Sequence, residues 1–205
     1  MLDGQILFDD CRGGVPEWHI DETLTRLIQA GTIDRGGHRS PPAHARVSAL
    51  QRPVFSPASL EPAGRQFPDF LASDAVPFVA GRYRIEKGPQ AIGGSSYGGI
   101  AALYALLQRP DLFTLGLLES PSLAVGNGQL LRDTEHLFKG PARVYLGMGG
   151  RESGRSADSA GNLAYVEMVR TLERNLKAIA ANPPEVLTVI QTDAKTPALS
   201  VGNSV

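Results

Sequence analysis

Strand-like and helix-like segments alternate between residues 66 and 190, and this order limits the possible folds more than any other feature of the chain. Short apolar runs typical of buried strands occur at 91–93, 115–118, 142–148 and 186–190. Strands that are separated by helices pair in parallel, because a crossover helix returns the chain to the same end of the sheet. The sequence therefore predicts an α/β fold with a mostly parallel sheet and helices on both faces.

The spacing of apolar residues indicates the helices between these strands. Phe67 to Val76 has helical spacing, and Pro77 is expected to end or kink that helix. An alanine- and leucine-rich helix is predicted over 100–108. Asn162 is expected to cap a longer helix whose apolar stripe consists of Leu163, Val166, Val169, Leu172, Leu176 and Ile179.

The first sixty residues are less regular. Asp21 is a candidate cap for a helix that places Leu24 on its apolar face and ends at Gly31. Residues 35–57 are rich in arginine and proline and have no sustained apolar alternation, so we expect an irregular segment there. We expect an irregular tail at 191–205 as well. The whole chain, 1–205, is expected to form one domain.

Composition excludes several classes of function. The chain has 205 residues, 42% of them hydrophobic, and a net charge of −1, which argues against general binding to nucleic acid or anionic membranes. Cys11 is the single cysteine, so no internal disulfide can form. No segment has the length and apolarity of a membrane span, and the first residues do not resemble a signal peptide. These features predict a cytoplasmic protein.

The segment Gly94-Ser95-Ser96-Tyr97-Gly98 carries the chemistry. It is a G-x-S-x-G match that follows an apolar strand and opens a helix. In this context the chain makes a tight strand-to-helix turn that exposes the central hydroxyl, and the helix N-terminus stabilises negative charge. Ser96 is therefore the predicted nucleophile. Ser95 lacks the required flanking glycines and is interpreted as a packing residue.

The chain resembles the putative-esterase family of α/β-hydrolases, which includes esterase D, feruloyl and enterochelin esterases and mycolyltransferases. Three blocks carry the resemblance: LDGQILFDD with EWHIDETLTRLI, the block from the G-x-S-x-G motif through DLFTLGLLESPSL, and ARVYLGMGGRES. The motif block is highly similar, and the other two are moderately specific. The resemblance implies an α/β-hydrolase fold and the hydrolysis of a small carboxylic ester, with no metal or organic cofactor.

The same resemblance implies roles for further residues. Gln5 corresponds to the residue that gives the second oxyanion N–H, beside that of Tyr97. Glu152, just after the strand ARVYLGM, corresponds to the acid that orients a histidine. Glu119 also follows a strand and is the rival acid, although the family uses that stretch to line its pocket. A solvated loop carboxylate is the alternative interpretation of Glu152.

The catalytic histidine of the family has no counterpart here. It lies in the loop after the last strand, which in this chain reads QTDAKTPALSVGNSV. Of the four histidines, His19 is the only candidate base, while His38, His44 and His136 are interpreted as surface residues. Because a serine hydroxyl is a poor nucleophile without a base, we expect impaired catalysis.

Two further departures concern the extent of the chain. It begins almost at the DGQ loop, and the arginine-rich segment 35–52 stands where the family has an apolar strand. The composition of this segment resembles out-of-frame reading of a GC-rich gene. We therefore expect a truncated or frame-disrupted product that is incomplete at both ends.

Three functions remain in competition. The first is a serine carboxylic-ester hydrolase that forms an acyl-enzyme on Ser96. The second is a non-catalytic remnant that binds a small molecule, and dependence of ester hydrolysis on Ser96 separates the two. Nucleic-acid binding by residues 35–52 is a third, which salt-dependent binding to duplex DNA would support. The sequence does not indicate the oligomeric state.

Overall fold

The computed structural model describes residues 19–32, 63–83, 88, 90–137, 139–153, 157 and 159–193. The irregular segment predicted at 35–57, the tail from residue 194, and the candidate residues Gln5, His38 and His44 lie outside these ranges.

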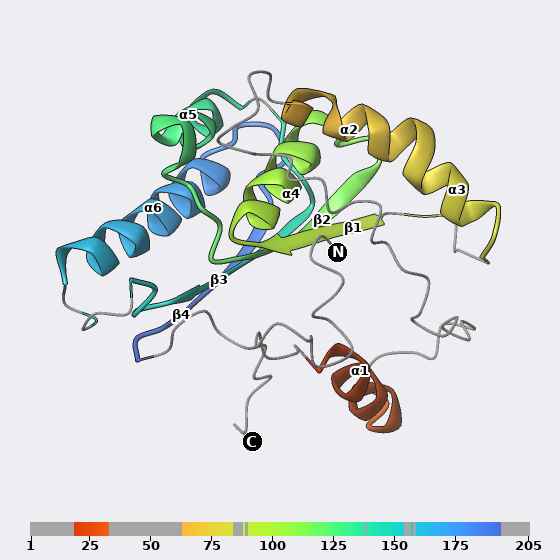
Figure 1. Ribbon diagram of the computed structural model, residues 1–205, viewed down its shortest axis with the longest axis horizontal. Helices are drawn as coiled ribbons and strands as arrows, with labels where there is room; N and C mark the ends of the chain where they lie inside the picture. The colour runs from red at the N-terminus through yellow and green to blue at the C-terminus, as the bar shows by residue number, and fades with distance from the viewer. Residues whose placement is uncertain are drawn as a thin grey trace.

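A parallel sheet of four strands forms the centre of the described part of the chain (Figure 1). The strands are β1 (Gln90–Ser95), β2 (Phe113–Glu119), β3 (Arg143–Gly149) and β4 (Glu185–Gln191). They lie side by side in the order β1-β2-β3-β4, and every neighbouring pair is parallel. The alternation of strands and helices in the sequence predicted this arrangement, which brings all four carboxyl ends to one edge.

Helices connect consecutive strands and lie mostly on one face of the sheet. Figure 1 shows α4 (Tyr97–Gln108), α5 (Val125–Asp133) and α6 (Ala160–Lys177) on the same side as α2 (Phe67–Phe70) and α3 (Val76–Ala80). Helix α4 packs on β1 and β2, and α6 packs on β3 and β4. Helix α1 (Ile20–Gln29) lies apart from them, on the opposite side of the sheet.

The core lies between the sheet and these helices. Its fully buried members include Leu103 and Leu106 of α4, Leu118 of β2 and Leu146 of β3, together with Leu172 of α6. A side chain at Gly116 would collide with Leu106, at 2.6 Å, so this glycine lets α4 lie close to β2. The opposite face of the sheet carries half-buried Leu117 and Tyr145 and, on β4, Leu187 at 60% exposure.

Several local predictions about helix ends were wrong. Helix α1 begins at Ile20 with His19 as its cap, so Asp21 lies inside the helix. Helix α6 begins two residues before Asn162, and the Ser159 hydroxyl accepts a hydrogen bond from the Asn162 N–H. Leu163 was expected in the apolar stripe but is 56% exposed, and the buried core residues of this helix begin at Val169.

Pro77 does not end the helical region that includes α2 and begins before it. The N–H of Val76 donates to the carbonyl of Leu71, five residues earlier, so the turn at Leu71–Ala75 is a π turn. The helix continues without a gap as α3, with Pro77 in its first turn. The extra residue in the turn before proline explains why the helix continues.

Candidate active site

The link between β1 and α4 is a sharp turn with Ser96 at its apex. Ser96 has φ 52° and ψ −116°, a backbone conformation that residues other than glycine rarely adopt. A Cβ at Gly94 would lie 2.6 Å from the backbone of Gly98, so strand and helix approach more closely than a side chain permits. These are the features that the G-x-S-x-G spacing predicted.

Backbone hydrogen bonds from three directions hold Ser96 in this conformation. Its N–H donates to the carbonyl of Glu119 at the end of β2, at 3.0 Å. Its carbonyl accepts from the N–H of Ser122 at 3.1 Å and from the N–H of Ile100 at 3.2 Å. Strain at one residue persists only when its surroundings fix it, and these bonds supply that restraint.

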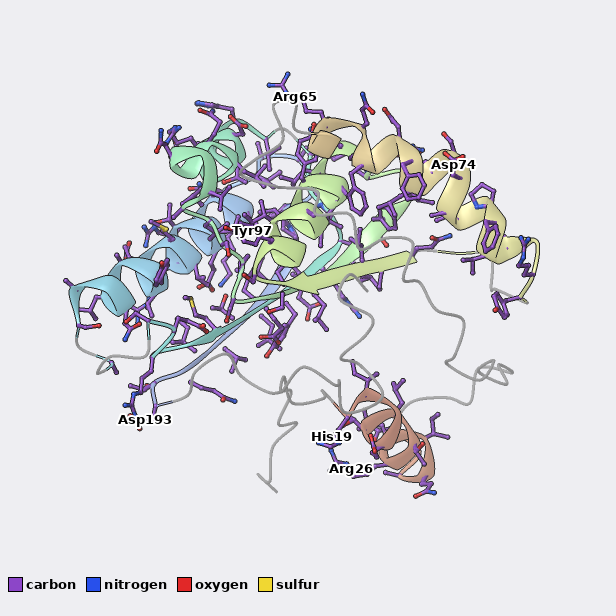
Figure 2. The ribbon with its side chains drawn as sticks, in the orientation of Figure 1. His19, Arg26, Arg65, Asp74, Tyr97 and Asp193 are labelled. Atoms are coloured by element: carbon purple, nitrogen blue, oxygen red, sulfur yellow. The ribbon has the colours of Figure 1, made fainter. Side chains whose placement is uncertain are left out.

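The side chain of Ser96 is exposed and meets a second serine. Its Oγ lies 3.0 Å from the Oγ of Ser122, at hydrogen-bonding distance. Tyr97 is the first residue of α4, at a helix end where N–H groups have no acceptor within the helix (Figure 2). The site therefore combines an accessible hydroxyl with the positive end of a helix dipole.

Glu152 lies in the turn after β3, at the same edge of the sheet as Ser96. Its Oε1 accepts hydrogen bonds from the Ser120 Oγ at 2.5 Å and from the N–H of Gly149 at 3.0 Å. Strand β3 is separated from β1 by β2 alone. Two donors directed at one carboxyl oxygen hold the Glu152 side chain in place at this edge of the sheet.

Glu119, the rival acid, is in a different environment. It is the last residue of β2 and its side chain is fully buried, with 0% exposure. Its carboxyl group lies over Gly147, where a Cβ would come within 2.0 Å of Oε2. Neither carboxyl oxygen has a hydrogen-bond partner of good geometry among the residues that the structure describes.

The burial of Glu119 therefore determines whether its carboxyl group is ionised. The pKa of Glu119 is raised to about 8, chiefly by burial and also by the nearby charge of Glu152, while the Tyr145 hydroxyl opposes the shift. Burial also raises the pKa of Tyr145 to about 12, with a further contribution from Glu119. At neutral pH, Glu119 is a neutral acid. An acid that orients and stabilises an imidazolium must be ionised, so this environment argues against Glu119 in that role.

The two histidines in the described part of the chain are His19 and His136. His19 caps α1 and lies 3.8 Å from the Glu22 carboxylate, and Figure 2 shows it well separated from Tyr97. His136 is exposed at the end of a short 3-10 turn, as expected of a surface residue.

The sequence analysis missed the roles of Ser120 and Ser122. Both lie in the Ser-Pro-Ser that follows β2, and one contacts Glu152 while the other contacts Ser96. The sequence does show two serines close together at the end of a strand. It does not show which side chain each hydroxyl contacts, because that depends on how the strands pair.

The described residues contain no cluster of three or more histidine, cysteine, aspartate or glutamate side chains that could hold a metal ion. They also contain no helix with the length and apolarity needed to cross a membrane.

Comparison with known families agrees with this geometry. The family model described as "Putative esterase" matches residues 1–183. The chain belongs to this esterase family. The match includes both the Ser96 turn and the Glu152 turn, as the sequence resemblance implied.

Two curated relatives of this esterase chain act on siderophores, according to their names. The ferri-bacillibactin esterase BesA of Bacillus subtilis is 33% identical over 84 residues, which are 37% of this chain and 29% of the relative. A siderophore enterobactin esterase of Emericella nidulans is 35% identical over 79 residues, covering 38% of this chain and 26% of the relative. The chain thus matches less than a third of the length of each.

A solved structure shows the same fold. The enterobactin esterase from Shigella flexneri, determined in the presence of enterobactin, superposes with a TM-score of 0.50 at 23% identity. The match covers 63% of this chain and 32% of the other. The esterase chain therefore has an α/β-hydrolase fold, as the sequence predicted.

Proposed function

We propose that this protein is a serine carboxylic-ester hydrolase with Ser96 as its nucleophile. The single observation that supports this most strongly is the strained turn at Ser96, with φ 52° at the junction of β1 and α4. Family membership supplies the reaction class. In the proposed reaction, Ser96 Oγ attacks the ester carbonyl, the alcohol leaves, and water then cleaves the acyl-enzyme.

Three further residues have proposed roles. The N–H of Tyr97, at the start of α4, donates to the oxyanion that develops on the carbonyl, and the N–H of Gln5 is the second donor. Glu152 is the orienting acid, supported by its position after β3 and by the two hydrogen bonds it accepts.

We further propose that catalysis is impaired, because the loop after β4 contains no histidine to take the proton of Ser96. In a well-studied serine protease, loss of the histidine lowers kcat about 10⁶-fold. Oxyanion stabilisation and binding alone keep about 10³- to 10⁴-fold over water. The relatives' names suggest a siderophore ester as the substrate class.

Hydrolysis of a short-chain aryl ester by the purified chain tests these proposals. We expect slow turnover, far below the enzyme median of about 10 s⁻¹, and loss in Ser96→Ala of the part that proceeds through an acyl-enzyme. Ser73→Ala is a matched control, because Ser73 is an exposed serine in the π turn at Leu71–Ala75. Figure 2 shows its neighbour Asp74 far from Tyr97.

Equal rates in the wild type and Ser96→Ala would contradict the hydrolase proposal and favour the alternative of a non-catalytic binding domain. A wild-type rate near the median, abolished by Ser96→Ala, would contradict the proposed impairment instead.

A further inference from the structure

Ser122 is held rigidly beside the nucleophile. Its N–H bonds to the Ser96 carbonyl, and its own carbonyl accepts from the N–H of Val125 at 3.1 Å. The preceding Pro121 packs so closely on α4 that a Cβ at Gly99 would lie 3.0 Å from it. The following Leu123 is buried in the core, at 2% exposure. The 3.0 Å contact between the two hydroxyl oxygens is therefore fixed by backbone structure on both sides.

The direction of this hydrogen bond has chemical consequences. A serine hydroxyl has one proton to donate and can accept two hydrogen bonds. If Ser96 donated to Ser122, its proton would point away from any base that could remove it. If Ser122 donates, the Ser96 proton is left available, and negative charge that develops on Ser96 Oγ is stabilised.

We propose that Ser122 is a further catalytic residue, whose hydroxyl donates a hydrogen bond to Ser96 Oγ. This role rests on the proposed function of Ser96 as nucleophile. The bond stabilises Oγ as it loses its proton during attack on the ester. It acts again during deacylation, when Oγ leaves the acyl carbon and carries negative charge.

Phosphonylation by a small alkyl fluorophosphonate measures this effect without requiring deacylation. A bond forms between Ser96 Oγ and phosphorus, the P–F bond breaks, and fluoride and the serine proton pass to solvent. The second-order rate constant is measured for the full chain, and mass spectrometry locates the label. We expect slow labelling at Ser96 in the wild type, because no histidine takes the proton of Ser96, and none in Ser96→Ala.

Removal of the Ser122 hydroxyl should slow this reaction. We expect Ser122→Ala to label at least about tenfold more slowly, since hydrogen bonds to charged groups contribute more than neutral ones. Ser122→Thr keeps the hydroxyl and should stay within about threefold of the wild type. Ser73→Ala should match the wild type, and equal melting temperatures would show that the variants fold.

The outcomes test the role of Ser122 separately from the role of Ser96. Labelling of Ser122→Ala at the wild-type rate overturns the role of Ser122 but leaves Ser96 as the nucleophile. A folded Ser122→Thr as slow as Ser122→Ala also overturns it, because the hydroxyl would then not be the decisive group. If Ser122→Ala fails to fold, Ser122→Cys, with a weak S–H donor, should give an intermediate rate, and a wild-type rate would overturn the proposal. Failure of the wild type to label at Ser96 would overturn the function itself.

Discussion

Glu119 places a neutral carboxyl group in the interior, at the carboxyl edge of the sheet. Its pKa is raised to about 8 from an ordinary value of 4.5, chiefly because burial disfavours the charged form. Between these two pH values the unfolded chain has lost a proton that the folded protein retains. The free energy of unfolding therefore falls as pH rises through this window, by up to about 1.4 kcal/mol per pH unit.

Replacement of Glu119 by its neutral isostere should remove this slope. We expect Glu119→Gln to melt at a higher temperature than the wild type at pH 8.5, with the difference shrinking or reversing at pH 5. Thermal unfolding between pH 5 and 9 measures the effect. Glu135→Gln, which changes an exposed carboxylate, is the control. Parallel curves for Glu119→Gln and the wild type would show that Glu119 is already ionised at neutral pH.

Residue-level features differ in how far the sequence reveals them. Ser96 could be found because its turn requires glycine at 94, where a Cβ would collide with the backbone of Gly98, and such a steric requirement leaves a fixed spacing. The burial of Glu119 could not be predicted, because it depends on the register that brings Gly147 beside it. The hydrogen bond between Ser96 and Ser122 joins residues 26 positions apart, and no local pattern encodes it.

At the scale of elements, the start of α6 is connected to the candidate site. Asn162 is 1% exposed, and its Oδ1 accepts a hydrogen bond from the N–H of Ser153 at 2.8 Å, directly after Glu152. The side chain thus ties the first turn of α6 to the turn that presents the candidate acid. Ser159 caps the same helix, and its Oγ accepts from the Asn162 N–H at 3.4 Å, a contact within the helix start itself.

Alanine substitutions should distinguish the contact of Asn162 with the turn after β3 from the cap that Ser159 provides. We expect Asn162→Ala to cost about 1–3 kcal/mol, because it removes a buried side chain that accepts a hydrogen bond from the Ser153 N–H, and to lower the esterase rate. Ser159→Ala should cost about 1 kcal/mol and leave the rate within about twofold of the wild type. Urea unfolding and aryl-ester turnover measure the two effects. A larger loss of turnover in Ser159→Ala than in Asn162→Ala would contradict this assignment.

Element types were easier to predict than element ends. Short apolar runs located all four strands to within a few residues, because a buried parallel strand must be apolar. Asn162 was misplaced as a cap because Ser159 and Asn162 are both good capping residues, and propensity alone does not choose between them. The short helix α5 was not predicted. It contains three consecutive residues with left-handed backbone, Gly126 to Gly128, which interrupt any helical pattern.

At the scale of the whole molecule, the apolar core formed by the described residues lies to one side of the sheet. Leu146 of β3 lies on the helix-covered face and has 0% exposure, whereas Leu187 of β4, on the opposite face, has 60%. The two leucines lie on neighbouring strands of one sheet but face different environments. Stability should therefore depend on the helix-covered face.

Paired substitutions on the two faces should show this difference. We expect Leu146→Ala to lower the free energy of unfolding by about 2–5 kcal/mol, through lost burial and a cavity. Leu187→Thr should change it by no more than about 0.5 kcal/mol, because it alters an exposed position and keeps a residue that favours strands. Urea denaturation measures both. A cost for Leu187→Thr comparable to that of Leu146→Ala would mean that the second face is also a packed core.

The order β1-β2-β3-β4 has a consequence for how the chain acquires its structure during synthesis. Each strand pairs with the strand made just before it, so the sheet can grow by one strand and one helix at a time as the ribosome releases the chain. No position between these four strands has to stay open for a strand that is synthesised later. The Ser96 turn is completed when β2 arrives, because the Glu119 carbonyl and the Ser122 N–H that restrain it follow soon after in translation. The strained nucleophile could thus form on the nascent chain before α6 and β4 have been made.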